Sequence, residues 1–174
     1  MHALIVVAHH DPQSLTHAVA AQVAAGLSSS GHTVEIADLA AEGFDPRYTC
    51  ADHLVHRTRA TPPADVLAEQ ARIDRVFVNG WAIDYGPDTP VLKKLRHLPV
   101  HLLGLGAADD SAFERDGYAK AMRTQIDYGI FDYCGAQVLT SELLLESESG
   151  NAQAHLRKAN AVGQGLFQAE ALVG

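Results

Sequence analysis

Apolar runs and amphipathic stretches alternate along the chain. Residues Ala3 to Val7 form a continuous apolar run, which predicts a central strand buried on both faces. From about Ser14 to Ser29 every fourth residue is apolar, which is the pattern of one buried helix face; the residues are Leu15, Val19, Val23 and Leu27. Gly31 ends this helix, and Thr33 to Leu39 then alternates as a second strand.

The next segment, Ala40 to Pro62, has no clear period. Such a long loop in a small domain is usually functional or a partner surface. Pro62 and Pro63 open a helix from Ala64 to about Arg72, and Arg75 to Asn79 is predicted as the third strand.

The alternation continues to the end of the sequence. We expect a loop at Gly80 to Pro90, a short helix at Val91 to Arg96, a strand at Val100 to Gly106 and a loop at Ala107 to Asp116. A helix at Gly117 to Tyr133 follows, with Met122, Ile126 and Ile130 on one apolar stripe. The last predicted elements are a strand at Gln137 to Leu143 and a helix at Ala152 to Leu172. This order predicts an α/β protein: one domain over residues 1–174, with a doubly wound, five-stranded parallel sheet and helices on both faces.

Composition and charge narrow the class of protein. The chain has 174 residues, 47% hydrophobic, and a net charge of −8, which argues against nucleic acid or an anionic membrane as the main partner. Cys50 and Cys134 lie far apart in no metal-binding spacing, and the N-terminus has no basic region of a signal peptide. We therefore expect a cytoplasmic protein with reduced thiols.

Ligands of such sheets bind at the carboxyl ends of the strands, which selects the loops His9 to Thr16, Gly80 to Pro90 and Ala107 to Asp116. Ser14 and Thr16 place hydroxyls at a helix N-terminus, where free N–H groups favour a phosphate. The alternative is that Ser14 only caps the helix. Neither a GxGxxG fingerprint nor a P-loop is present.

The ten histidines raise the question of a metal. The close pairs are His9 with His10, His53 with His56, and His97 with His101. None has the HExxH form, so we expect no metal site.

Several motifs together resemble a known family. They are AHHDPQSLTHA at residues 8–18, GHTV and DL at 31–34 and 38–39, GFDP at 43–46, AEQ at 68–70, IDRVF at 73–77 and YCG at 133–135. The chain resembles the flavodoxin-like NAD(P)H:quinone oxidoreductases, of the NAD(P)H dehydrogenase (quinone) and modulator of drug activity B type, from residue 1 to about 167.

The resemblance implies a homodimeric enzyme. Its flavin, FAD or FMN, would pass a hydride from NAD(P)H to a quinone or similar small acceptor. By position the implied flavin contacts are His9, Ser14, Leu15, Thr16, Gln70, Asn79, Gly80, Trp81, Ala82, Ala107, Ala108 and Phe113. His9, Ser14, Leu15 and Thr16 would contact the phosphate and ribityl part, and Trp81 and Ala107 to Ala108 the ring.

The sequence departs from the family pattern in two places. The family's strand, aromatic flavin-stacking loop and helix before IDRVF are absent, so we infer that Arg75 to Asn79 fills the third-strand position. Trp81 and Tyr85 should then line the cleft beside His9 and Ala107. A family Tyr and His align with Phe113 and Ala119, which cannot move a proton, so the catalytic candidates are Tyr85, Asp84 and Tyr118.

Two other functions stay open. A flavin-free relative would use the same cleft for non-redox chemistry on a small molecule, with Asp84, Tyr85, His9 or His10 as acid–base groups. A non-catalytic module would instead bind a partner through Ala40 to Pro62.

Overall fold

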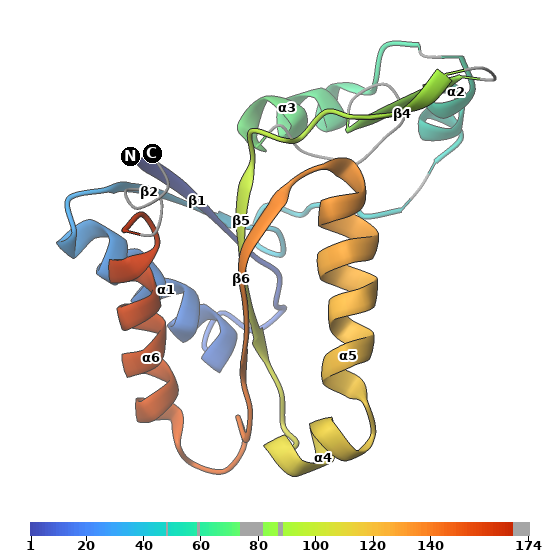
Figure 1. Ribbon diagram of the computed structural model, residues 1–174. Coiled ribbons are helices and arrows are strands. Elements are labelled where there is room, and N and C mark those ends of the chain that lie inside the picture. Colours follow the sequence, from blue (N-terminus) through green and yellow to red (C-terminus); the bar gives the residue numbers. More distant parts are fainter. Residues whose placement is uncertain (48, 59, 74–81, 87–88, 169–174) are drawn as a thin grey trace. The chain divides into compact units, whose positions relative to one another are not determined.

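The computed structural model describes residues 1–47, 49–58, 60–73, 82–86 and 89–168 (Figure 1). They group into two compact units. The first unit contains Met1–Asp45, Leu103–Ala112 and Leu143–Gly174, and the second contains Pro46–Leu102 and Phe113–Glu142. Among the described residues, no helix is long and apolar enough to cross a membrane.

The first unit begins with a β–α–β arrangement that agrees with the predicted elements. Strand β1 (His2–Val7) pairs in parallel with β2 (Thr33–Asp38), from His2 opposite Thr33 to Val7 opposite Asp38. Helix α1 (Leu15–Ser29) connects them. Because the strands are parallel and in register, both carboxyl ends reach the same edge, where Leu39 N–H donates to the Val7 carbonyl over 2.9 Å.

The predicted stripe of α1 forms the core of this unit. Val19, Val23 and Leu27 are buried together with Leu144 and Ala159. Partly buried side chains from both strands, from the start of α1 and from the end of β5 pack against this cluster, among them Ile5, Leu15, Leu103 and Leu105. The apolar spacing of the sequence is therefore the packing face of the helix.

Helix α6 (Ala152–Gly165) packs unusually closely along α1, and Figure 1 shows the two helices side by side. Two glycines permit this approach. A Cβ atom added at Gly26 would overlap the Asn160 carbonyl oxygen, and one added at Gly163 would overlap the Val23 carbonyl oxygen. The closing helix ends at Gly165 rather than continuing to Leu172 as predicted; residues 166–168 form a turn, and 169–174 lie outside the described residues.

Strands β5 (Pro99–Leu105) and β6 (Gln137–Leu144) form a hydrogen-bonded pair, close to the predicted fourth and fifth strands. Gln137 N–H donates to the Leu98 carbonyl near the start of the pair, and Gly106 N–H donates to the Leu144 carbonyl near its end. The two strands therefore run in the same direction, as a parallel sheet requires.

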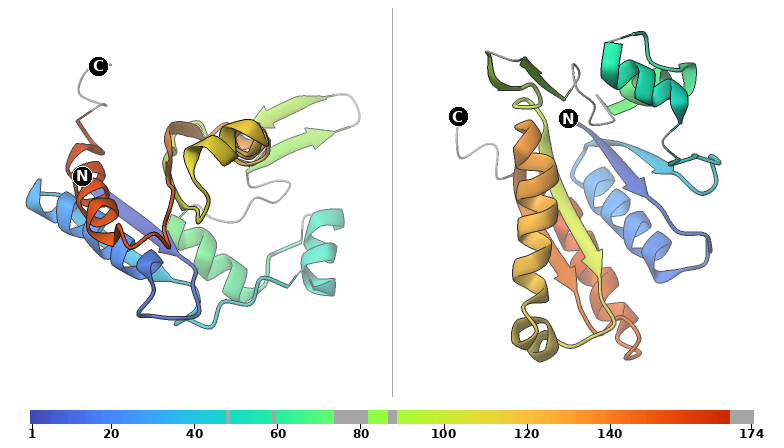
Figure 2. Two further views of the ribbon diagram at one scale, coloured as in Figure 1. Left: turned by 90° about the horizontal axis from the view of Figure 1, so that it is seen from below. Right: turned by 90° about the vertical axis from the view of Figure 1, so that its right-hand side faces the viewer.

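The second unit contains a hairpin where we predicted a loop and a helix. Strand β3 (Ile83–Gly86) pairs antiparallel with β4 (Thr89–Lys93), visible as two adjacent arrows in the left view of Figure 2. The predicted helix from Val91 to Arg96 is wrong. Pairing with β3 places Leu92 opposite Asp84 and Lys93 opposite Ile83, and this tertiary pairing overrides the local helical pattern.

The single five-stranded parallel sheet is not seen among the described residues. Their strands form three two-stranded sheets, β1–β2, β3–β4 and β5–β6, and the middle one is antiparallel. The predicted third strand, Arg75 to Asn79, lies outside the described residues. The α/β alternation holds, while the count of five parallel strands depends on a segment that the structure does not describe.

The predicted loop from Ala40 to Pro62 contains helix α2 (Cys50–Thr58), followed by α3 (Ala64–Ile73) as predicted. A capping box starts α2: Thr49 Oγ1 donates to Asp52 Oδ2 over 2.6 Å, and Asp52 N–H donates back to Thr49 Oγ1 over 3.3 Å. The Thr-x-x-Asp spacing was the local signal for this helix.

Two further segments differ from their predicted form. The loop from Ala107 to Asp116 contains helix α4 (Asp110–Arg115), capped by Asp109 Oδ1, which accepts from Ala112 N–H over 2.8 Å. The predicted helix from Gly117 to Tyr133 is α5 (Tyr118–Met122) followed by a π-helix, η1 (Arg123–Asp132). Wider π winding changes the phase of an i, i+4 stripe, and Ile130 is 41% exposed.

Candidate functional site

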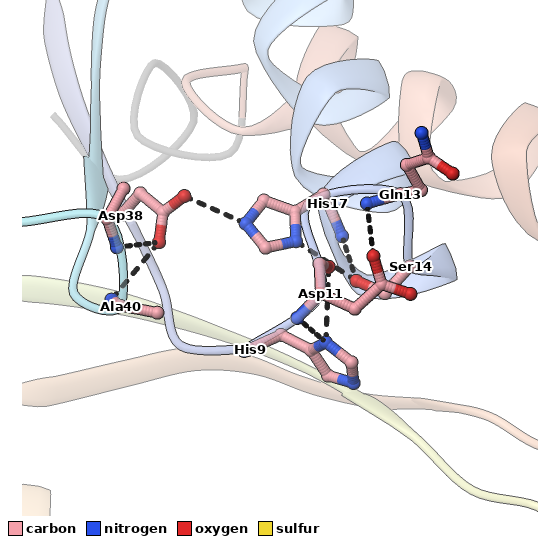
Figure 3. Close-up of polar contacts among 8 residues, drawn as sticks. His9, Asp11, Gln13, Ser14, His17, Asp38 and Ala40 are labelled. Atoms are coloured by element: carbon pink, nitrogen blue, oxygen red, sulfur yellow. Dashed lines mark hydrogen bonds and ion pairs between the residues drawn. The ribbon is translucent and has the colours of Figure 1, made fainter.

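The loop after β1 is held by its own polar groups (Figure 3). His9 Nδ1 accepts from Asp11 N–H over 3.1 Å, and Asp11 Oδ1 accepts from Gln13 N–H over 2.9 Å. Ser14 N–H donates to the Asp11 carbonyl over 3.1 Å. These bonds fix the path of the chain between the end of β1 and the start of α1.

Ser14 is the N-cap of α1, with φ −66° and ψ 158°, and its Oγ accepts from His17 N–H over 3.4 Å. Ala18 N–H donates to the Ser14 carbonyl. The N–H groups of Leu15 and Thr16 therefore have no partner within the helix. Together with the helix dipole, they make this end of α1 a favourable place for an anion.

His17 connects the helix start to the neighbouring strand. Its Nδ1 lies 3.0 Å from Ser14 Oγ, and its Nε2 lies 2.9 Å from Asp38 Oδ2 at the end of β2 (Figure 3). The side chains of His17 and Asp38 are 16% and 26% exposed. The sequence analysis left His17 without a role. The alignment of His17 with Asp38 is set by strand pairing, so no local signal could have revealed it.

Asp38 is anchored from two sides. Its Oδ1 accepts from the N–H groups of Ala41 and Ala40, each over 3.1 Å. The Ala41 N–H, followed by the hydrogen bond from His17, lowers the pKa of the Asp38 carboxyl below its ordinary value. The carboxylate form is therefore the one that faces His17 at neutral pH.

The loops after β5 and β6 are bonded to each other in the same unit. Glu146 N–H donates to the Ala108 carbonyl over 3.1 Å, and Ser147 N–H donates to the Gly106 carbonyl over 3.0 Å. Glu146 has φ 56°, a left-handed conformation that is rare for residues other than glycine. Glu146, in this strained conformation, thus holds the exposed loop residues Ala107 and Ala108 through its hydrogen bond to the Ala108 carbonyl.

The first loop and the loop after β5 leave the same core. Leu15, directly after Ser14, and Leu105, directly before Gly106, both pack against the buried cluster of the first unit. Of the predicted flavin contacts, this unit contains His9, Ser14, Leu15, Thr16, Ala107 and Ala108.

The remaining candidates that the structure describes belong to the second unit. Ala82 is fully buried in a cluster with Leu95, Cys134 and Ala136. Phe113 lies edge-on to Tyr118 with ring centroids 5.7 Å apart, and Tyr118 is 53% exposed.

Gln70 Nε2 is buried, with no hydrogen-bond partner among the described residues. Asp84 is half-buried in β3. Asn79, Gly80, Trp81 and the side chain of Tyr85 lie outside the description, so their predicted place beside His9 and Ala107 stays a prediction.

The second unit also contains a groove that the sequence did not indicate. It has a volume of about 560 Å³ and lies between η1 and the first half of β6. Its polar wall includes Ser141 Oγ, which donates to Asp127 Oδ1 over 3.1 Å. Within the described ranges, no three His, Cys, Asp or Glu side chains gather as metal ligands.

Comparison with known proteins gives the chain a family. The profile of the flavodoxin-like fold matches residues 1–73 and 71–164, nearly the whole sequence. The two matched segments meet at 71–73, directly after the AEQ motif and where the sequence comparison placed an absent segment. No curated protein sequence matches the chain.

Solved structures share the fold at low identity. An NAD(P)H:quinone oxidoreductase from Methanothermobacter marburgensis is 24% identical with a TM-score of 0.80, over 95% of this chain and 96% of that one. A putative quinone reductase from Klebsiella pneumoniae is 18% identical with a TM-score of 0.77, over 95% and 83%. An azoreductase from Bacillus anthracis is 14% identical with a TM-score of 0.61, over 94% and 98%. The protein therefore belongs to the flavodoxin-like fold family.

Proposed function

We propose that the protein is a flavin-dependent oxidoreductase that transfers a hydride from NAD(P)H through bound FAD or FMN to a quinone or similar small acceptor. The observation that carries the proposal is the donor set at the start of α1. The first turn of this helix follows the carboxyl end of β1 and contains the hydroxyl-bearing residues Ser14 and Thr16 and the N–H groups of Leu15 and Thr16. Membership of the flavodoxin-like fold family supports a flavin phosphate as the anion that such a set would hold.

The chemistry of this donor set fits the phosphate-bearing part of a flavin. Phosphate oxygens accept hydrogen bonds from hydroxyls and from N–H groups at helix N-termini, where the dipole adds attraction. Gln70 Nε2 supplies a second argument, because a buried amide without a partner is costly unless something accepts from it. A flavin carbonyl or ring nitrogen would be such an acceptor.

The chain's own residues would bind the flavin and orient it toward the acceptor, while the flavin, when bound, supplies the hydride and electron transfer. The first loop would hold the phosphates. The exposed backbone of Ala107 and Ala108 would approach the ring, with their methyl groups limiting how closely it does so. Asp84, Tyr85 and Tyr118 remain the proposed residues for proton movement near the acceptor.

The fold neighbours support this reaction class. Two of the three solved structures are named as quinone reductases and the third as an azoreductase, all enzymes that reduce small molecules. Their low sequence identity to this chain supports only a shared fold. The acceptor and the activity of this protein are therefore part of the proposal.

A second candidate is a flavin-free relative that uses the same cleft for non-redox chemistry. The observation in its favour is a cluster of imidazoles at the first loop. The rings of His9 and His10 stack at 4.7 Å, and His9 lies edge-on to His17 at 6.2 Å. Imidazole side chains are the commonest general acids and bases in enzymes.

Visible absorbance of the purified protein separates the two candidates. We expect yellow protein, or colourless protein that binds added FAD or FMN and then oxidises NAD(P)H in the presence of menadione. Ser14→Ala should weaken flavin binding roughly 10- to 150-fold, by the loss of one hydrogen bond to a charged group. Exposed Ser28→Ala, near the other end of α1, is the control. Folded protein that binds neither flavin would contradict the proposal and favour the second candidate.

We also infer a cytoplasmic homodimer. The unpaired state of Cys50 and Cys134 suits a reducing compartment. Helix η1 exposes Tyr128 and Ile130, apolar groups of a kind that a subunit interface covers.

A further inference from the structure

His17 lies between a carboxylate and a hydroxyl, and this geometry restricts its hydrogens. An ionised Asp38 only accepts hydrogen bonds, so the Nε2 atom 2.9 Å from it carries a hydrogen. The open question is the other ring nitrogen, Nδ1, 3.0 Å from Ser14 Oγ. Its protonation decides which of the two atoms donates.

The two protonation states of His17 use the Ser14 hydroxyl differently. In neutral His17, Nδ1 accepts from Ser14, and the hydroxyl hydrogen is occupied within the cluster. In charged His17, Nδ1–H donates to Ser14 Oγ, which already accepts from His17 N–H. The hydroxyl hydrogen is then free to be donated to a group outside the helix.

We propose that His17 is a proton-linked positioning residue for Ser14, and that an anionic ligand at the start of α1 binds together with one proton taken up by His17. The proposal rests on the proposed function, which places the phosphate-bearing part of a ligand at this loop. An anion needs Ser14 as a donor, and only charged His17 releases that hydroxyl. Asp38 orients the ring and stabilises its charge.

Other charged or titratable groups around His17 also influence whether its imidazole takes up the second proton. Asp38 from β2 favours the charged ring. His9, edge-on at 6.2 Å with His10 stacked on it, opposes a second positive charge when protonated. Asp11 lies in the same loop, and helix α6, packed along α1, carries buried His155.

Proton uptake during binding is the direct test. FAD is the probe, because its phosphates carry no proton that titrates near neutral pH. Titration calorimetry at about pH 7.5, in buffers of different ionisation enthalpy, gives the protons taken up per FAD bound. We expect up to about one proton for the wild type, set by one imidazole. His17→Gln should take up almost none, and riboflavin, which lacks phosphate, should bind without uptake.

Three variants separate this role from a merely structural one. His2→Gln, an exposed histidine at the start of β1 and outside the proposed site, should retain the uptake of the wild type. Ser14→Ala should lose most of it, because its hydroxyl links the anion to the ring. Asp38→Asn should move the uptake to lower pH, because it removes the charge that favours the imidazolium. Equal uptake in wild type and His17→Gln, or tight FAD binding without uptake between about pH 6 and 8, would overturn the proposal.

A second measurement distinguishes failure of this inference from failure of the flavin assignment. The imidazole signal of His17, followed by NMR over pH with and without inorganic phosphate, requires no flavin. A higher titration midpoint in phosphate, absent in Ser14→Ala, supports the proton link even if neither FAD nor FMN binds. An unchanged midpoint in phosphate together with no flavin binding would overturn both.

Discussion

At the scale of single residues, the first unit concentrates its polar contacts at two places. One is Asp38, which holds His17 and two backbone amides of the following turn. The other is Glu146, whose left-handed backbone holds the loop after β6 against Ala108. Each place allows a prediction with a matched control.

Asp38 should make stability depend on pH on the acid side. Its folded pKa lies below its ordinary value, so its contribution is present above the unfolded pKa of about 3.9 and is lost as pH falls through the folded pKa. Asp38→Asn should therefore lower the urea midpoint at neutral pH, and its difference from the wild type should shrink below about pH 4. Asp65→Asn, exposed on α3, is the control. A difference that stays constant with pH would contradict the assignment.

Glu146→Gly should stabilise the protein. Glycine adopts positive φ without the Cβ penalty, so relief of strain at φ 56° outweighs the added entropy of the unfolded chain. We expect a gain of about 1 kcal/mol in the free energy of unfolding. Glu148→Gly, exposed nearby, should destabilise slightly. A lower free energy of unfolding for Glu146→Gly would mean that the Glu146 side chain stabilises the protein by more than its left-handed backbone destabilises it.

At the scale of elements, the crossing of α1 and α6 determines how the first unit packs. Gly26 and Gly163 let the backbones approach so closely that a side chain at either position meets backbone atoms of the other helix. Flexible side chains could move aside, but these carbonyl and amide groups belong to hydrogen-bonded helices. The contact therefore tolerates no added volume.

Gly163→Ala should destabilise the protein by about 1–3 kcal/mol or more, because the helices must separate. Gly165→Ala is a matched control in the same helix, since nothing lies within 4 Å of a Cβ atom there. That substitution should be neutral or stabilise by up to about 1 kcal/mol through helix propensity. Chemical denaturation of both variants measures the contrast, and equal midpoints would show that α1 and α6 do not pack as described.

At the scale of the whole molecule, we predict a homodimer that uses the face of η1 formed by Arg123, Tyr128 and Asp132, which lines the groove beside β6. Tyr128 is 66% exposed near the middle of this helix, with Arg123 at one end and Asp132 at the other. In an antiparallel pair of such helices, each Arg123 faces the partner's Asp132, so that the two-fold axis creates this pair twice. Arg123→Glu should therefore dissociate the dimer in sedimentation experiments. Exposed Arg157→Glu on α6 is the charge control, and a wild-type monomer at micromolar concentration would contradict the prediction.

Much of the first unit could be predicted because its signals are local. The apolar run of β1, the four-residue spacing on α1 and the serine at its cap each act over a few residues, and the predicted strand, helix and cap are confirmed. The predicted burial of β1 on both faces is not seen, because Val6 is 46% exposed and only Val7 is buried. Such patterns specify an element wherever its apolar face finds a core. The loop where Ser14 lies follows from the same signals.

Contacts between distant residues required the folded chain. His17 and Asp38 are 21 positions apart, and they meet because parallel pairing in register brings Asp38 opposite Val7, at the edge where α1 begins. The hairpin β3–β4 and the π winding of η1 likewise replaced locally predicted forms. Local propensities differ by less than about 1 kcal/mol per residue, whereas strand pairing and burial act on many residues together. Pattern alone therefore places the helices and strands of the first unit, and packing between them decides which side chains form the site.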